Sequence, residues 1–207
     1  MRREVQTDMD LSSKLFDEQV WPLCREACGY GRLLQMEGVR DNELAKQLDT
    51  LAGIDGWQIR GKWKSDPGGM RGIAARVQVG TDWRTFTIRK QRDTGASTEY
   101  EKRVEAIDGK MGYLYPIITV HSYAVGWDGP ILSVGISRTI TIIRFIQDRL
   151  RRGIAKQNRT ERRGAADFWV CKWAEMNRAG YPVFTVDGKT GQTCLPVYHQ
   201  ANVVQPP

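Results

Sequence analysis

Residues 48–90 constrain the fold more than any other part of this chain. They contain three runs in which apolar and polar residues alternate, and Gly and Pro residues lie between the runs. Such alternation is typical of β-strands that bury one face. The runs carry Trp57, Ile59 and Trp63, then Ile73, Val77 and Val79, then Trp83, Phe86 and Ile88. We therefore expect three adjacent strands, joined by two hairpins.

Helical patterns precede and follow these strands. Residues 41–53 repeat Leu at helical spacing, and Thr98 with Glu101 has the spacing of a capping box, which predicts a helix that ends near Ile107. Further helices are predicted over residues 10–20 and 137–150, and further strands over residues 114–125, 130–136, 167–173 and 181–187. Helices and strands in this order indicate an α/β fold, with a mixed central β-sheet flanked by helices.

The length and composition are those of a single soluble domain. The 207 residues suit one domain, with a core at about residues 40–140 and a basic helix and C-terminal extension at residues 137–207. Hydrophobic residues make up 41% and charged residues 27%, which is typical of globular proteins. No apolar run approaches the ~20 residues that span a bilayer, and the N-terminus lacks the apolar block of a signal peptide. We expect a cytoplasmic protein without a membrane partner.

Positive charge exceeds negative charge, with 31 Lys and Arg against 24 Asp and Glu and a formal net charge of +7. This excess favours a polyanionic partner, so we expect nucleic acid, with DNA favoured. Between Arg138 and Arg163 there are nine Lys or Arg residues and two acids. The candidate nucleic-acid contacts are Arg89, Arg103, Arg149, Arg151, Arg152, Lys156, Arg159, Arg162 and Arg163. Alternatively, the basic stretch is a solvated helix end whose charge favours the helix C-terminus.

Aromatic residues are candidates for stacking on bases. Trp63, Tyr123 and Trp127 would serve if their rings are exposed, although large rings usually belong to the core.

Asp55 and Gln78 are the two residues in the strand region that suggest a chemical role. Asp55 opens the first strand, and Gln78 interrupts the apolar second strand. A carboxylate at the start of one strand and an amide on its neighbour are able to share one metal ion, because Mg²⁺ takes oxygen ligands. The same pair is able to share one phosphate.

The order helix, strand with Asp55, strand with Gln78, third strand, helix, strand resembles the core of the PD-(D/E)xK nuclease-like superfamily. The resemblance implies a restriction-endonuclease-like core. It also implies a metal-dependent endonuclease or exonuclease, a hydrolase that cleaves phosphodiester bonds in DNA or RNA. Asp55 and Gln78 would bind Mg²⁺ or Mn²⁺, with Glu43 as a further carboxylate. In that superfamily a Lys lies two residues beyond the second metal ligand, so that both side chains face the scissile phosphate.

Gly80 stands at the position of that Lys. Lys90 or Arg89 on the third strand would then supply the positive charge. Lys90 is the better proton donor or acceptor, and Arg89 is the better phosphate clamp. The catalytic candidates are therefore Asp55, Gln78, Lys90 and Glu43. If neither cation points into the site, the fold would remain without catalysis.

Structural interpretations compete with these assignments. Asp55 precedes Gly56, and Asp-Gly is a common turn pair. The neighbours of Gln78 do not alternate cleanly, so the direction of its side chain is open, and Glu43 also suits a solvated helix. Two other functions stay open: a catalytically inactive nucleic-acid-binding protein of the same fold, and a structural or protein-interaction domain. The sequence leaves open whether the protein forms a homodimer.

Overall fold

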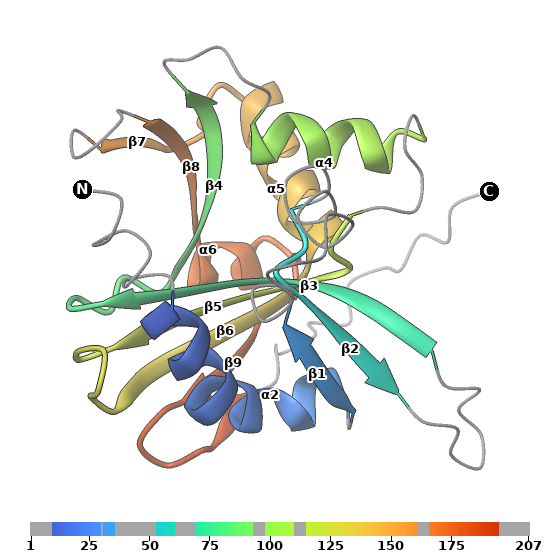
Figure 1. Cartoon of the computed structure of the whole chain (residues 1–207). Helices are drawn as coiled ribbons and strands as arrows, with labels where there is room; N and C mark the ends of the chain where they lie inside the picture. The colour runs from blue at the N-terminus through green and yellow to red at the C-terminus, as the bar shows by residue number, and fades with distance from the viewer. Residues whose placement is uncertain are drawn as a thin grey trace.

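The computed structural model describes residues 10–29, 31–35, 53–60, 69–92, 98–109, 115–160 and 166–194. Glu43 and most of the helix predicted over residues 41–53 lie outside the described residues, as do Trp63, Arg162 and Arg163. The described part of the chain is a mixed α/β fold with two β-sheets (Figure 1).

The larger sheet has seven strands in the order β1-β2-β3-β5-β6-β9-β10. Their bounds are Arg32–Gln35 (β1), Gly56–Arg60 (β2), Gly69–Val79 (β3), Ile118–Ala124 (β5), Ile131–Arg138 (β6), Phe184–Asp187 (β9) and Thr193–Cys194 (β10). β3 and β5 pair in parallel, whereas the other neighbouring strands pair antiparallel. The mixed central sheet that the sequence predicts is confirmed.

The three strands predicted side by side do not all join this sheet. The first two, β2 and β3, pair as expected, but the third, β4 (Thr85–Arg92), belongs to a separate sheet. There it pairs with β8 (Ala166–Lys172), which pairs with β7 (Gln157–Thr160). The second predicted hairpin is therefore wrong. The turn after β3 contains Gly80 and Arg84 at φ +101° and +49°, and the chain leaves the plane of the sheet instead of returning along β3.

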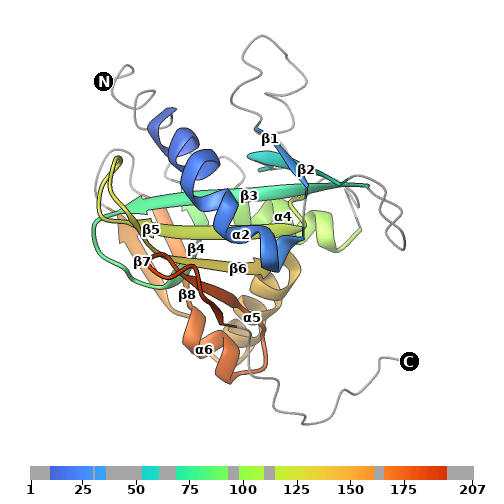
Figure 2. The same ribbon diagram turned by 90° about the horizontal axis from the view of Figure 1, so that it is seen from below.

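Helices cover both faces of the large sheet. On one face a helix runs from residue 10 through the π-helical turn η1 (Phe16–Val20) into α2 (Trp21–Cys28). On the other face lie the second sheet and the helices α4 (Glu99–Ile107), α5 (Thr139–Arg151) and α6 (Trp173–Arg178), as Figure 2 shows from below.

The predicted capping box at the start of α4 is confirmed. The Glu101 N–H donates to Thr98 Oγ1, and the Thr98 N–H donates to the Glu101 carboxylate at 2.8 Å. These bonds satisfy two donors that a helix start otherwise leaves open. None of the helices within the described ranges has both the length and the apolar character needed to cross a membrane.

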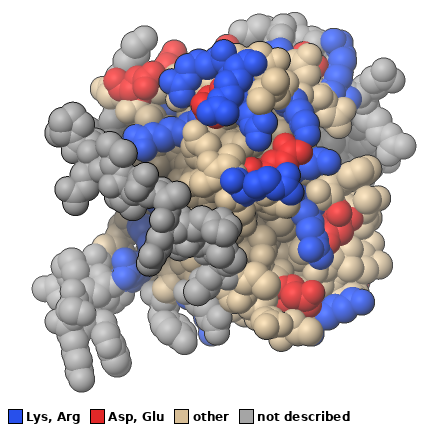
Figure 3. Space-filling model, turned by 180° about the vertical axis from the view of Figure 1, so that it is seen from behind, with Lys and Arg blue, Asp and Glu red and all other residues tan. Residues whose placement is uncertain are grey.

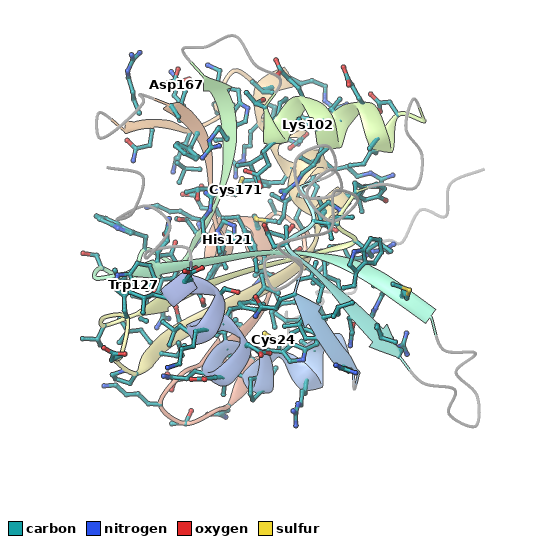
Figure 4. The ribbon with its side chains drawn as sticks, in the orientation of Figure 1. Cys24, Lys102, His121, Trp127, Asp167 and Cys171 are labelled. Atoms are coloured by element: carbon teal, nitrogen blue, oxygen red, sulfur yellow. The ribbon has the colours of Figure 1, made fainter. Side chains whose placement is uncertain are left out.

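Alternate residues of the central strands enter two separate apolar cores. On β3, Ile73 and Val77 pack towards α2, together with Val20 and Val134. The second core lies on the opposite face and contains residues of β4, β8, α5 and α6. In Figure 4 Cys24 lies on the α2 side of the large sheet. Because side chains alternate along a strand, Arg76 and Gln78 project to the face of the second core, where both line one groove.

Gly135 on β6 allows α6 to lie against the large sheet. A Cβ at this position would lie 2.2 Å from Cε2 and 2.3 Å from Cζ2 of the Trp173 ring. Trp173 opens α6 and is buried against Phe86 and Tyr123. Because α6 follows β8 directly, this contact holds the second sheet at a fixed place over the first.

Candidate functional site

A groove of about 810 Å³ lies between the second half of β3 and the second sheet. β3 contributes its floor, β4, β8 and β7 contribute a wall, and the turns after β3 and β5 close one end. Its volume is within the range of ligand sites in proteins. The charged, polar and aromatic residues that line it include Arg76, Gln78, Asp82, Trp83, Thr87, Trp127, Asn158, Phe168 and Lys172.

Aromatic rings and cations share this groove. Trp83 is 67% exposed, Lys172 is exposed, and Trp127 is half-buried after β5 (Figure 4). The guanidinium groups of Arg76 and Arg89 lie over the ring of Phe168, each 5.5 Å from its centroid. Contacts of this kind contribute about 0.5–2 kcal/mol each, depending on how far water is excluded. The two contacts hold the Phe168 ring and both guanidinium groups in place beside the groove.

Arg76 reaches from β3 to two other elements. Its Nη1 donates to Thr87 O at 2.9 Å and to Thr87 Oγ1 at 2.6 Å on β4. Its Nη2 lies 3.6 Å from Glu99 Oε2 on α4. The side chain keeps 27% of its surface exposed, so it is anchored by protein and still faces the groove.

Glu99 is the carboxylate that joins these elements. Its Oε1 lies 2.5 Å from Arg103 Nη2, and its Oε2 accepts a hydrogen bond from the Arg89 N–H at 3.1 Å. Burial alone would raise the pKa of Glu99. Arg103, Arg76 and the Arg89 N–H outweigh that effect and lower the pKa to about 2. Glu99 is therefore ionised at neutral pH.

His121 lies beside Arg76 in the parallel pairing of β5 with β3. It is buried, and its Nδ1 accepts a hydrogen bond from the Thr87 N–H at 3.4 Å. Burial and the nearby positive charge of Arg76 lower the pKa of His121 to about 3. The imidazole is neutral at neutral pH, so it adds no charge to the two guanidinium groups and one carboxylate around it.

Asp55 has a structural partner at the edge of β3. It precedes β2, and its Oδ2 accepts a hydrogen bond from the Ala75 N–H at 2.6 Å. β2 pairs with β3 only as far as Ile73. Beyond that point the Asp55 carboxylate, and not the β2 backbone, accepts the hydrogen bond from the β3 backbone. Asp55 also lines a small hollow with Ser12 and Gln35, on the side of the sheet that faces α2.

The structure does not bring Asp55 and Gln78 into one cavity. Gln78 lines the groove, and Asp55 lines the hollow that Ile73 and Val77 share on the opposite side of β3. The pair therefore does not fit a shared Mg²⁺ ion, which needs its oxygen ligands at about 2.0–2.1 Å. Within the described ranges, no three His, Cys, Asp or Glu side chains gather as a metal-binding group.

The two cations proposed to replace the missing Lys lie on β4. Lys90 Nζ lies 4.8 Å from the centroid of the Trp169 ring and donates to Gln157 Oε1 at 2.9 Å. Arg89 lies over Phe168. Neither residue lines the groove of Gln78 or the hollow of Asp55, so Asp55, Gln78 and Lys90, the predicted catalytic residues that the structure describes, do not share either cavity.

Several predicted nucleic-acid contacts have partners within the protein. Arg103 is wrong as a surface contact, because its side chain is 2% exposed and bound to Glu99. Arg151 and Arg152 lie 3.7 Å and 3.2 Å from the carboxylate of Asp148. Figure 3 shows Lys and Arg side chains interspersed with acidic ones on the face seen from behind. The remaining described candidates are Arg89, over the Phe168 ring, Arg149, over the Phe145 ring, Lys156, paired with Glu175, and Arg159, which is exposed on β7.

Most residues of the groove were not predicted from the sequence. Trp127 was among the stacking candidates and lines the groove, whereas Tyr123 is fully buried. Arg76 carried a usable signal, because it lies two residues before Gln78 and must share its face of the strand. Phe168 and Lys172 carried no such signal, because only the pairing of β8 with β4 brings them to the groove.

Comparison of the chain with protein-family models, with curated proteins and with solved structures found no match.

Proposed function

We propose that this chain binds nucleic acid without hydrolysing it, and that the groove between β3 and the second sheet is the binding surface. One observation carries the proposal: basic side chains, Arg76 and Lys172, lie in one open groove with the aromatic side chains of Trp83, Trp127 and Phe168. Phosphates are attracted to the cations, and bases stack on exposed rings such as that of Trp83.

The Arg76 guanidinium is held in place at the groove floor. Arg76 and Arg103 both pair with Glu99, Asp55 adds a second negative charge near Arg103, and His121 is neutral. The bonds from Arg76 to Thr87 set the direction of the guanidinium before a ligand arrives, which lowers the entropy that binding costs.

The hydrolase has less support than binding alone. The residue at position 80, where the superfamily has Lys, adopts φ +101°, which L residues rarely adopt. The turn therefore requires Gly80 for its own geometry. Asp55 holds the edge of β3, and Gln78 faces the other side. A metal-dependent nuclease stays a prediction from the sequence resemblance.

Binding and its dependence on salt test the proposal. Labelled DNA and RNA oligonucleotides would be titrated with the wild-type chain, Lys172→Ala and Lys14→Ala, with fluorescence anisotropy as the readout. Lys14 is the matched control, because it is also exposed but lies on the first helix, which covers the opposite face of the large sheet. We expect Lys172→Ala to weaken binding several-fold and to lower the slope of log K against log salt by about 0.7–0.9. Lys14→Ala should change neither quantity.

Two outcomes would contradict the proposal. No binding of any oligonucleotide at about 50 mM salt would leave the structural or protein-interaction domain as the better hypothesis. Equal losses in Lys172→Ala and Lys14→Ala would mean that general surface charge, and not the groove, attracts the nucleic acid. Both variants change exposed side chains, so their thermal midpoints should match that of the wild type.

A further inference from the structure

We infer that the groove binds unpaired nucleotides, so that the ligand is single-stranded nucleic acid and not a duplex. This inference rests on the proposed function and adds the form of the ligand.

The turn after β3 presents Trp83 to solvent in a fixed position. Asp82 Oδ1 accepts a hydrogen bond from Ser133 Oγ at 2.7 Å, and Asp82 Oδ2 lies 3.1 Å from Arg84 Nε. Arg84 adopts φ +49°, and its carbonyl accepts from the Trp173 N–H at 3.0 Å. Such a backbone conformation is costly for a residue with a side chain, and it persists only where the surroundings hold it. Here the contacts of Asp82 and Arg84 hold the Trp83 ring away from the core.

Gln78 supplies a neutral donor and acceptor in the same groove. Its amide is half-buried, and none of the residues that the structure describes forms a hydrogen bond with it. It lies two residues from Arg76 on one strand face, which places their Cα atoms about 6.6 Å apart. A guanidinium for phosphate and an amide for a base edge therefore lie next to each other, and Gln is able to bond a base edge through both its groups.

A duplex cannot use these features together. In a double helix each base face is covered by its neighbours, so an aromatic ring on a protein has no face to stack on. The major groove of DNA is read by a protruding helix or a two-stranded ribbon, whereas this site is a hollow lined by strand faces and by the turn that holds Trp83. Unpaired bases expose both their faces and their edges. The faces match the Trp83 ring, the edges match the Gln78 amide, and the phosphates match the cations.

The test compares oligonucleotides of one composition in single-stranded and duplex form, as DNA and as RNA. We expect the single strands to bind at least tenfold more tightly than the duplexes. Trp83→Leu, which keeps an apolar side chain without a π face, should lose about 5- to 150-fold in affinity for single strands. Trp83→Phe should lose less. Gln78→Leu should alter the preference among the four bases and leave the salt slope unchanged.

The outcomes separate this inference from the proposed function. If duplex binds as tightly as single strand, and Trp83→Leu is harmless while Lys172→Ala is not, the groove binds nucleic acid but the single-strand inference is overturned. If no oligonucleotide binds, both fall. Trp83 is largely exposed, so its variants should keep the thermal midpoint of the wild type, and a loss of affinity would then report a lost contact.

Discussion

Arg76 has partners on three elements besides its own strand: Thr87 on β4, Glu99 on α4 and Phe168 on β8. It also lines the groove, so its structural and binding roles cannot be separated by replacing it. Lys172 and Trp83 line the same groove and are exposed, which makes them the better positions at which to measure binding.

At the same scale, His121 makes the stability of the fold depend on pH. Unfolded chains bind a proton at His below the usual pKa of 6.5, whereas folded His121 does so only near pH 3. Acid therefore favours the unfolded state, and the free energy of unfolding should fall by about 2 kcal/mol from about pH 7 to about pH 5. Urea unfolding at a series of pH values would measure this.

His121→Asn is the control for that prediction. The amide oxygen of Asn is able to accept the Thr87 N–H in place of Nδ1, but it does not titrate. In the unfolded chain, Glu99 begins to take up a proton only near its usual pKa of 4.5. The variant should therefore lack most of the fall in the free energy of unfolding between about pH 7 and about pH 5. An equal slope in both proteins would show that His121 is not the titrating group.

At the scale of elements, Glu99 joins α4 to β3 and β4. Glu99→Gln keeps the shape of the side chain but removes the carboxylate that pairs with both Arg103 and Arg76 in a mostly buried place. Breaking a buried ion pair from one side costs about 3 kcal/mol or more, which urea unfolding would detect. Glu105→Gln on the exposed face of α4 is the matched control and should change stability by less than about 0.5 kcal/mol. Equal effects would rule out the joining role of Glu99.

Local sequence patterns predicted which strands and helices form better than they predicted which strands pair. Alternation found the strands β2, β3 and β4, and the capping box found the start of α4, because both signals act between residues close in sequence. β4 pairs with β8, which lies far from it in the sequence, so no pattern of neighbouring residues predicts this pairing. The separation of Asp55 from Gln78 was not predicted either, because Asp55 lies before β2 begins and its carboxylate binds the β3 backbone.

At the scale of the whole molecule, the separation of Asp55 from Gln78 predicts how the protein behaves with divalent metals. We expect single-stranded and duplex DNA and RNA to remain intact when incubated with the protein and Mg²⁺ or Mn²⁺, with EDTA as the control. Gel electrophoresis would measure cleavage. Asp55→Asn is the informative variant, because Asn is able to accept the Ala75 N–H while losing the carboxylate charge.

Metal-dependent cutting that disappears in Asp55→Asn would contradict this expectation and establish a nuclease centred on Asp55. Cutting that persists unchanged in Asp55→Asn would point to a contaminating enzyme. Because the variant should keep the edge of β3 intact, its thermal midpoint should stay near that of the wild type.

The second sheet joins β4 to β8, a strand that the ribosome makes only after residues 1–165. β4 cannot pair with β8 before residue 166 has been synthesised, although β2, β3, β5 and β6 are complete by residue 138. During that interval Arg76 on β3 lies on a sheet face that still lacks the cover of β8. The groove is thus among the last parts of the molecule to assemble.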